Sequence, residues 1–468
     1  MKRIRGEEDT SRGSSASRNE TSRARTPARP NQRLWPSSSL YLSPTITQRP
    51  TPATHDGHYK MLLSYYIDSF VPNISVANVP ANFFTSVYVP MAYHCEAVYN
   101  AIIACASAHL AKAAPDQDRQ AQLLEISLEC QLQCRSFLRE RISLSGALLR
   151  DVLEASAVIL LLIGLEVQNG EISPRWVSQL TCVRNIIMQH GGKYPFCRRS
   201  WEARSIYHHF LYHDVMSLIM AGVTEDEVQD DPDDSLVSIE SPANPVEWEK
   251  PWAVYLKASN VAMSSEELKQ ACESYPAHPL LGLSMNLFEL IQKIRHVRPM
   301  GDSPDVLQSS LFLDLEHKLI RLGFELYPSA GDYFCNPDIG TRLDLVVLAE
   351  MYRLAALIIL YRRSSAHSLH LPGIARHIVL LSKRIPEGNN AEAGLTYPLF
   401  LAGAELDSES DILLCAQRLM DMRHRTNVMN IQSVEKVLEE VWRTRLNKGT
   451  HLDWEEVLRE WHWVINLG

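Results

Sequence analysis

Long apolar runs and a secretory leader are both missing from this chain of 468 residues. The longest mainly apolar run covers residues 155–165, far short of the roughly 20 residues that a membrane-spanning helix needs. Residues 1–9 are mostly charged and lack the apolar core of a signal peptide. We therefore expect an intracellular protein that makes no contact with a membrane.

The sequence also lacks the common catalytic motifs: G-x-G-x-x-G opening a βαβ unit, G-x-x-x-x-G-K-[ST], G-x-S-x-G and H-E-x-x-H. His209 and His213 lie four residues apart in a helical pattern, beside Asp214, and two imidazoles at this spacing can share a metal ion. Their aromatic neighbours favour core positions instead. His190 with two following glycines could form an oxyanion loop, but its place after a helix favours a helix end. We predict no enzyme activity and no catalytic, cofactor-binding or metal-binding residue.

Closely spaced cysteines are absent as well. The nine cysteines are odd in number and scattered, which favours free thiols in a reducing compartment over a disulfide framework. Cys130 and Cys134 lie four apart with no matching pair nearby, so we interpret them as buried thiols. The first cysteine is Cys95, and no C-x2-C-x6-C pattern that could wrap a zinc cluster is present. We therefore expect this chain to hold no cofactor.

Charge is unevenly distributed along the chain. Residues 1–60 hold 11 Lys and Arg against 5 Asp and Glu, so they carry a net charge of +6. Because the whole chain has a net charge of −9, the remaining residues carry −15. Residues 1–55 are rich in Ser, Thr, Pro and Arg, and we expect this basic tail to be disordered. Lys2, Arg3 and Arg5 form a small basic cluster, which is either a nuclear-import signal, a DNA-contacting arm or a solvated tail. The acidic body is a poor surface for nucleic acid.

Helical periodicity dominates residues 56–468, and no stretch alternates convincingly with period two. The sequence predicts an all-α fold, a large irregular helical bundle. Its two helical halves flank an acidic segment at 224–242, interpreted as a surface loop, with an acidic activation segment as the alternative. Helices are expected over residues 59–70, 90–115, 116–140, 151–168, 174–190, 201–221, 265–273, 282–297, 309–326, 341–363, 371–384, 408–425, 431–446 and 454–465.

Three helices carry specific expectations. Residues 90–115 should form one long central helix, with small alanines that let neighbouring helices approach closely. The apolar residues of the next helix are Leu123, Leu124, Ile126, Leu128 and Leu132. In the helix over 341–363, Glu350 and Arg353 lie three apart and can form an ion pair.

Several segments together resemble a known family. They include residues 82–92 (with Asn82-Phe83 and Val89-Pro90-Met91-Ala92), 100–110, 176–192, 212–216, 278–283, 349–358 and 397–405, and then Trp442 and Asp453-Trp454. Their order resembles the regulatory domain, of the second type, of fungal zinc-cluster transcription factors. No single segment is diagnostic, but the resemblance runs from about Tyr59 to residue 468.

The resemblance implies a nuclear transcription regulator of metabolic genes, among them secondary-metabolite clusters. The implied partners are the transcription machinery or other regulators, a small-molecule effector and a second copy of the chain. Because the zinc cluster of the relatives is missing, DNA is expected to be reached only indirectly or through an upstream module. A helical adaptor or ligand-binding module without a DNA role is the alternative interpretation.

Overall fold

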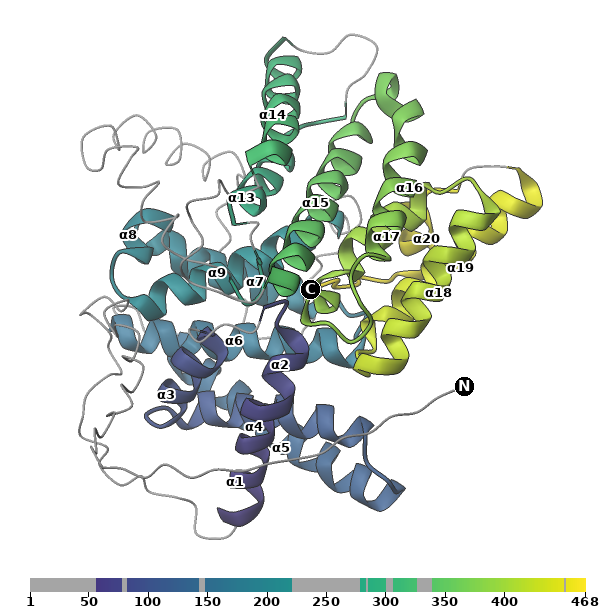
Figure 1. Ribbon diagram of the computed structural model, residues 1–468. Helices are drawn as coiled ribbons and strands as arrows, with labels where there is room; N and C mark the ends of the chain where they lie inside the picture. Colours follow the sequence, from purple (N-terminus) through teal and green to yellow (C-terminus); the bar gives the residue numbers. More distant parts are fainter. Residues whose placement is uncertain are drawn as a thin grey trace, which may run out of the picture. The chain divides into compact units, whose positions relative to one another are not determined.

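The computed structural model describes residues 56–77, 82–142, 148–220, 278–282, 285–299, 306–325, 339–449 and 452–468. Within these ranges all the regular elements are helices, and the single β-bridge joins His278 to Gly282. The all-α prediction is therefore confirmed (Figure 1). The predicted tail at 1–55, the acidic segment at 224–242 and the predicted helix at 265–273 lie outside the described residues.

The helices before residue 220 are α1 (Asp56–Tyr65), α2 (Val71–Ile74), α3 (Val89–Ala92), α4 (Glu96–Lys112), α5 (Gln117–Ile142), α6 (Leu149–Asn169), α7 (Arg175–Gln189), α8 (Lys193–Cys197) and α9 (Trp201–Met216). The later helices are α13 (Met285–Ile294), α14 (Val306–Glu325), α15 (Ile339–Tyr361), α16 (Leu371–Ser382), α17 (Thr396–Glu405), α18 (Glu409–Thr426), α19 (Asn430–Lys448) and α20 (Trp454–Trp461). Short 3-10 turns include η6 (Ser365–His370) and η7 (Asn390–Gly394).

Two π-turns interrupt the first helical segments at prolines. The turn η1 (Tyr66–Phe70) leads directly into α2, and η2 (Phe84–Tyr88) leads directly into α3. In both cases a Val-Pro pair opens the next helix. A proline has no N–H and its ring presses on the carbonyl four residues earlier, so a wider turn before it relieves the clash.

The prediction of one continuous helix over residues 90–115 is wrong, because the structure has two helices there. Cys95 has extended backbone angles, φ −128° and ψ 113°, and separates the short α3 from α4. No side-chain cap marks this break, because Cys95 makes no capping hydrogen bond. Helix α3, before the break, contacts the preceding η2 and the following α4. The helix ends at Lys112, ahead of the predicted stop at Pro115.

The leucines predicted as the apolar face of α5 are also partly wrong. Leu124, Leu128 and Leu132 are 46%, 58% and 58% exposed, whereas Leu123 is buried. The buried face instead carries small residues that fit the alanines of α4. Ser127 donates to the Ala104 carbonyl at 2.9 Å, and Cys134 lies 3.3 Å from the Ala97 carbonyl. Small groups on both helices permit this close approach, and bulky leucines on the same face would prevent it.

The helices of the first half pack around α6, which contacts α4, α7 and α9. Almost every side chain of α6 is buried, as the sequence predicts for a central helix. Helix α7 ends at Gln189, and Gly191 and Gly192 follow with φ of +93° and +81°. This left-handed backbone favours glycine, so the pair ends the helix as predicted.

The helices of the second half pack around α17, which contacts α15, α16, α18 and α19. This helix was not among those predicted. Every residue from Thr396 to Glu405 is buried, so the sequence shows no apolar stripe against a polar one. Trp442 of α19 donates to the Gly403 carbonyl at 2.8 Å, where a side chain at Gly403 would collide with Leu438.

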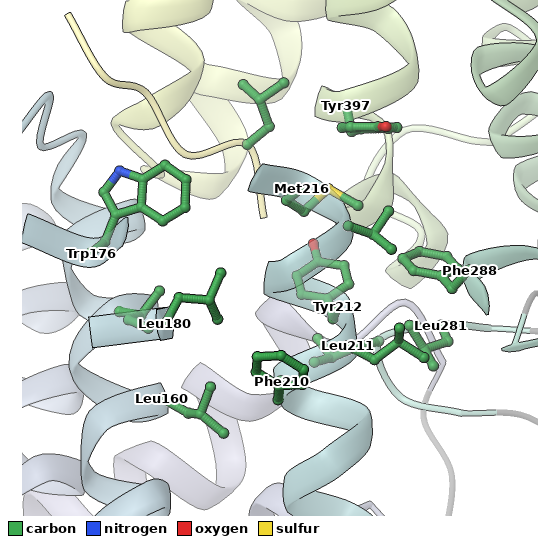
Figure 2. Packing of buried hydrophobic residues seen from close by; sticks show 14 of the residues in the cluster. Leu160, Trp176, Leu180, Phe210, Leu211, Tyr212, Met216, Leu281, Phe288 and Tyr397 are labelled. Carbon is green, nitrogen blue, oxygen red and sulfur yellow. The ribbon is translucent and has the colours of Figure 1, made fainter. Parts of the chain in front are cut away.

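A chain of stacked and tilted aromatic rings joins the two groups of helices. Tyr212 of α9 lies 6.1 Å from Phe288 of α13, measured between ring centroids. Phe288 lies 5.0 Å from Tyr352 of α15, which lies 5.7 Å from Tyr397 of α17. Figure 2 shows Tyr212, Phe288 and Tyr397 in this packed interior, with Trp176 on the opposite side of α9.

The segment after α20 forms a second connection between the groups. The Val464 amide donates to the Ile172 carbonyl at 3.0 Å, and the Trp176 indole donates to the Val464 carbonyl at 3.4 Å. Val464, Ile465 and Leu467 are buried. This segment therefore adds an extended, buried strip of chain to the core between α7 and the last helices.

Candidate functional site

A cavity of about 100 Å³ lies where the two groups of helices meet. Its lining comes from α2 and η2, from α4, α6 and α9, and from η7, α17, α18, α19 and the final residues. The lining residues that carry the argument are Phe84, Gly164, Gln168, His213, Glu392 and Asn430. Because segments from both ends of the domain build its wall, a molecule bound there would contact both halves at once.

The wall of the cavity is mostly apolar. Phe70, Leu160 and Leu161 belong to the first half, and Met422 and Leu467 belong to the second. No lysine or arginine occurs among the described residues that line it. Pockets of this kind, apolar with a few polar groups, are typical sites for small molecules.

Gly164 leaves an opening in the wall on the α6 side. It lies in the interior of α6, and a Cβ atom added there would meet no atom within 4 Å. An alanine would favour the helix more strongly than glycine at this position. The glycine therefore enlarges the cavity at a cost to helix propensity.

Two histidines of the cavity wall, His209 and His213, form a hydrogen-bonded relay with Tyr88. The Tyr88 hydroxyl lies 2.7 Å from Nδ1 of His209, and Nε2 of His209 lies 3.2 Å from Nε2 of His213. Burial lowers the pKa of His213 to about 3, and burial together with His213 and His278 lowers the pKa of His209. Both rings are thus neutral at physiological pH, and each carries one proton.

The direction of this relay follows from Tyr88. Its hydroxyl is buried, and its hydrogen bond among the described residues joins it to His209; we assign the O–H as the donor to Nδ1 of His209, because the opposite assignment would leave the hydroxyl proton unpaired. The proton of His209 then lies on Nε2, which donates to Nε2 of His213. With this assignment the proton of His213 lies on Nδ1, and Nδ1 has no hydrogen-bond partner among the described residues.

Two buried amide side chains of the wall are also incompletely paired. Gln168 Nε2 lies 3.5 Å from the Cys105 carbonyl, and Asn430 Nδ2 lies 3.3 Å from the Asn466 carbonyl. Their carbonyl oxygens, Gln168 Oε1 and Asn430 Oδ1, have no partner in the described part of the chain. Buried polar atoms normally find a partner, so unpaired ones beside a cavity mark places where a bound molecule can supply it.

The charged group of the wall is already paired. Glu392 lies 3.0 Å from Arg418 and 2.7 Å from Arg425 of α18. A second network follows His213 in the chain, where Asp214 lies 3.0 Å from Arg295 and also contacts Arg184. The two arginines keep the pKa of the Asp214 carboxyl near 2 against the effect of burial. These ion pairs fix the surroundings of the cavity.

The residues that the sequence singled out for their chemistry lie at separate places in the fold. His209 and His213 do face one another, but no group of three potential metal ligands occurs among the described residues. Cys130 and Cys134 are buried free thiols with raised pKa values, caused mainly by burial. The Glu350–Arg353 ion pair is present, with Nε of Arg353 2.7 Å from Oε2 of Glu350. Lys2, Arg3 and Arg5 lie outside the described residues.

The structure adds Tyr88, Gln168 and Asn430 to the candidate residues. Tyr88 lies 121 residues before His209, and Asn430 lies far beyond both. A hydroxyl in an aromatic segment, or an amide at a helix end, gives no signal of such partners in the sequence. Only the folded chain brings Gln168 and Asn430 to the cavity and Tyr88 to His209.

The family model for the fungal-specific transcription factor domain matches residues 61–468. The chain belongs to this family. The match spans nearly all the described helices, which agrees with the resemblance drawn from the sequence. The transcriptional activator protein UGA3 of Saccharomyces cerevisiae is similar to the chain, at 21% identity over 421 residues. These cover 87% of this chain and 77% of the yeast protein.

Nothing among the solved structures matches the chain. The family and the yeast relative are concerned with transcription, so membership makes the protein a transcription regulator. In the described part of the chain, no helix is both long and apolar enough to cross a membrane. The cysteines described here are dispersed and mostly buried, so they do not fit a zinc cluster.

Proposed function

We propose that the protein is a nuclear transcription regulator that controls metabolic genes, secondary-metabolite clusters among them, through its fungal-specific transcription factor domain. The observation that carries this proposal is the family match over residues 61–468. The similarity to a transcriptional activator supports the same class of function. The basic cluster of Lys2, Arg3 and Arg5 supports import into the nucleus.

The helical domain acts as the receiver of a signal in this proposal. The cavity supports a small-molecule effector, because its wall draws on both groups of helices. A ligand that contacts both groups shifts their equilibrium by its differential affinity for the two arrangements. The output then passes to the transcription machinery or to other regulators, alone or as a homodimer.

Contact with DNA is indirect in this account, or passes through an upstream zinc-cluster module. Residues 1–468 contain no C-x2-C-x6-C pattern, and the residues after 60 carry a net charge of −15. Purified protein should therefore fail to bind promoter DNA at about 0.15 M salt, where weak phosphate contacts are screened. Specific binding at that salt concentration would overturn this part of the proposal.

Deletion of the gene, combined with transcript sequencing and imaging of a tagged protein, tests the main proposal. We expect nuclear signal and altered transcripts of a defined set of metabolic genes. An adaptor without a role in transcription, favoured by the acidic body, would leave those transcripts unchanged and lie outside the nucleus. That pair of results would reject the proposal.

A further inference from the structure

We infer that the cavity takes a compact, uncharged, largely apolar molecule that carries one hydrogen-bond acceptor and one donor, as a primary amide does. The inference rests on the proposed effector role for its biological meaning. Its test measures binding alone, so failure of the inference and failure of the role in transcription can be told apart.

The charge of the ligand follows from the wall. A carboxylate or phosphate needs a cationic partner when it leaves water, and the described lining offers no lysine or arginine. The cations next to lining residues are engaged, because Lys112 donates to the main-chain carbonyl of Gln168 and Arg418 and Arg425 hold Glu392. The same two arginines neutralise Glu392, the acidic side chain among the described lining residues, so an ammonium ligand finds no free carboxylate side chain there.

The polarity of the ligand follows from the three unpaired atoms. Nδ1–H of His213 is a donor and calls for an acceptor on the ligand. Gln168 Oε1 and Asn430 Oδ1 are acceptors and call for a donor. All three side chains are at least nine-tenths buried, so water does not freely replace a ligand there.

The apolar lining residues decide the chemical nature of the rest of the ligand. Phe70 and Phe84 offer aromatic faces from one side, and Met422 and Leu467 offer flexible or branched apolar groups from the other. An aromatic or branched aliphatic body fills such a space and gains from its removal from water.

Four probes of nearly equal size separate the requirements: benzamide, acetophenone, benzoate and benzamidine. Benzamide has the acceptor and the donor without charge. Acetophenone lacks the donor, benzoate adds a negative charge and benzamidine a positive one. Ligand-detected NMR titrations with the full chain should give benzamide the highest affinity, with the other three at least tenfold weaker.

Two variants of Gly164 locate the binding. Gly164→Leu should fill the cavity, because a Cβ there meets open space, and should weaken benzamide at least tenfold. Gly164→Ala changes the same position by one methyl group and should keep most of the binding. Circular dichroism and thermal unfolding check that both variants are folded.

Binding of benzamide by wild type and by Gly164→Ala, and its loss in folded Gly164→Leu, would support the inference. Absence of benzamide binding to wild type would overturn it. So would tighter binding of benzoate or benzamidine than of benzamide, or equal binding to wild type and Gly164→Leu. If Gly164→Leu does not fold, the ranking of the four probes on wild type decides alone.

Discussion

The two groups of helices bury polar side chains in different ways. In the group from α1 to α9 most are neutral: imidazoles such as His109 and His209 with lowered pKa values, and thiols such as Cys105. In the group from α15 to α20 the buried carboxylates Glu392 and Glu405 are held in ion networks, by Arg418 and Arg425 and by Arg362 respectively. The first group also buries carboxylates, at Glu154, Glu166, Glu202 and Asp214, and Asp214 is held by arginines of α7 and of the α13 region.

This difference bears on where the protein can respond to a ligand. Ion networks with several partners hold one geometry, because each carboxylate is fixed from more than one side. Neutral histidines and amides can exchange hydrogen-bond partners without leaving a buried charge. The cavity lies at the border of the two groups, with its adaptable atoms on His213, Gln168 and Asn430 and its fixed ion pair at Glu392.

The largest effect should come from Asp214, a buried carboxylate of the first group that two arginines hold. Asp214 is fully buried and holds Arg184 and Arg295. Asp214→Ala leaves two arginines facing each other without their carboxylate, and should lower the free energy of unfolding by about 3–5 kcal/mol. Urea unfolding followed by circular dichroism measures it. A loss below about 1 kcal/mol would mean that this network does not hold α7, α9 and α13 together.

A smaller loss is expected in the second group at Arg362. Its guanidinium lies 2.5 Å from Glu405, 2.7 Å from Asp453 and 3.3 Å from Glu455, and so joins α15 to α17 and α20. Arg362→Gln should cost about 1–3 kcal/mol, because Asp453 and Glu455 are a third exposed and regain water. Urea unfolding compares it with Arg376→Gln, whose side chain is 66% exposed. Equal losses for both would contradict the comparison.

In the first group, His109 should make the stability of the fold depend on pH. Burial, with a contribution from Lys112, lowers the pKa of His109 to about 4. Between about pH 6.5 and 4 the unfolded chain binds a proton there that the folded chain does not, so stability falls as the pH falls. His109→Gln should therefore reduce the slope of stability against pH by up to about 1.4 kcal/mol per unit. Urea unfolding at several pH values tests this, with exposed His377→Gln as the control.

The smallest effect concerns the exposed leucines of α5. Leu128→Gln should change stability by less than about 0.5 kcal/mol, because the side chain is 58% exposed. The matched substitution Leu123→Ala removes a fully packed side chain and should cost about 2–5 kcal/mol. Thermal unfolding of both variants measures the difference. A large loss of stability for Leu128→Gln would instead support the apolar face of α5 that the sequence predicts.

Most helices could be predicted from the sequence because apolar residues at helical spacing and turn residues such as Gly191 and Gly192 mark them locally. Helix α17 escaped prediction because it is buried on all sides. No capping side chain marks the break at Cys95. The buried face of α5 depends on the alanines of α4 that it meets, and no local pattern encodes that. His209 and His213 were recognisable by their spacing, whereas Tyr88, Gln168 and Asn430 meet them only through the fold.

The most direct test of the whole account compares transcripts in cells that carry wild type, Gly164→Ala or Gly164→Leu as the full chain. Genes that depend on the protein should respond to changes of growth medium with wild type and with Gly164→Ala. With Gly164→Leu, at equal protein level, they should stay at one level in every medium, because the cavity is filled. A full response with Gly164→Leu would contradict the account, since the signal would then be received elsewhere.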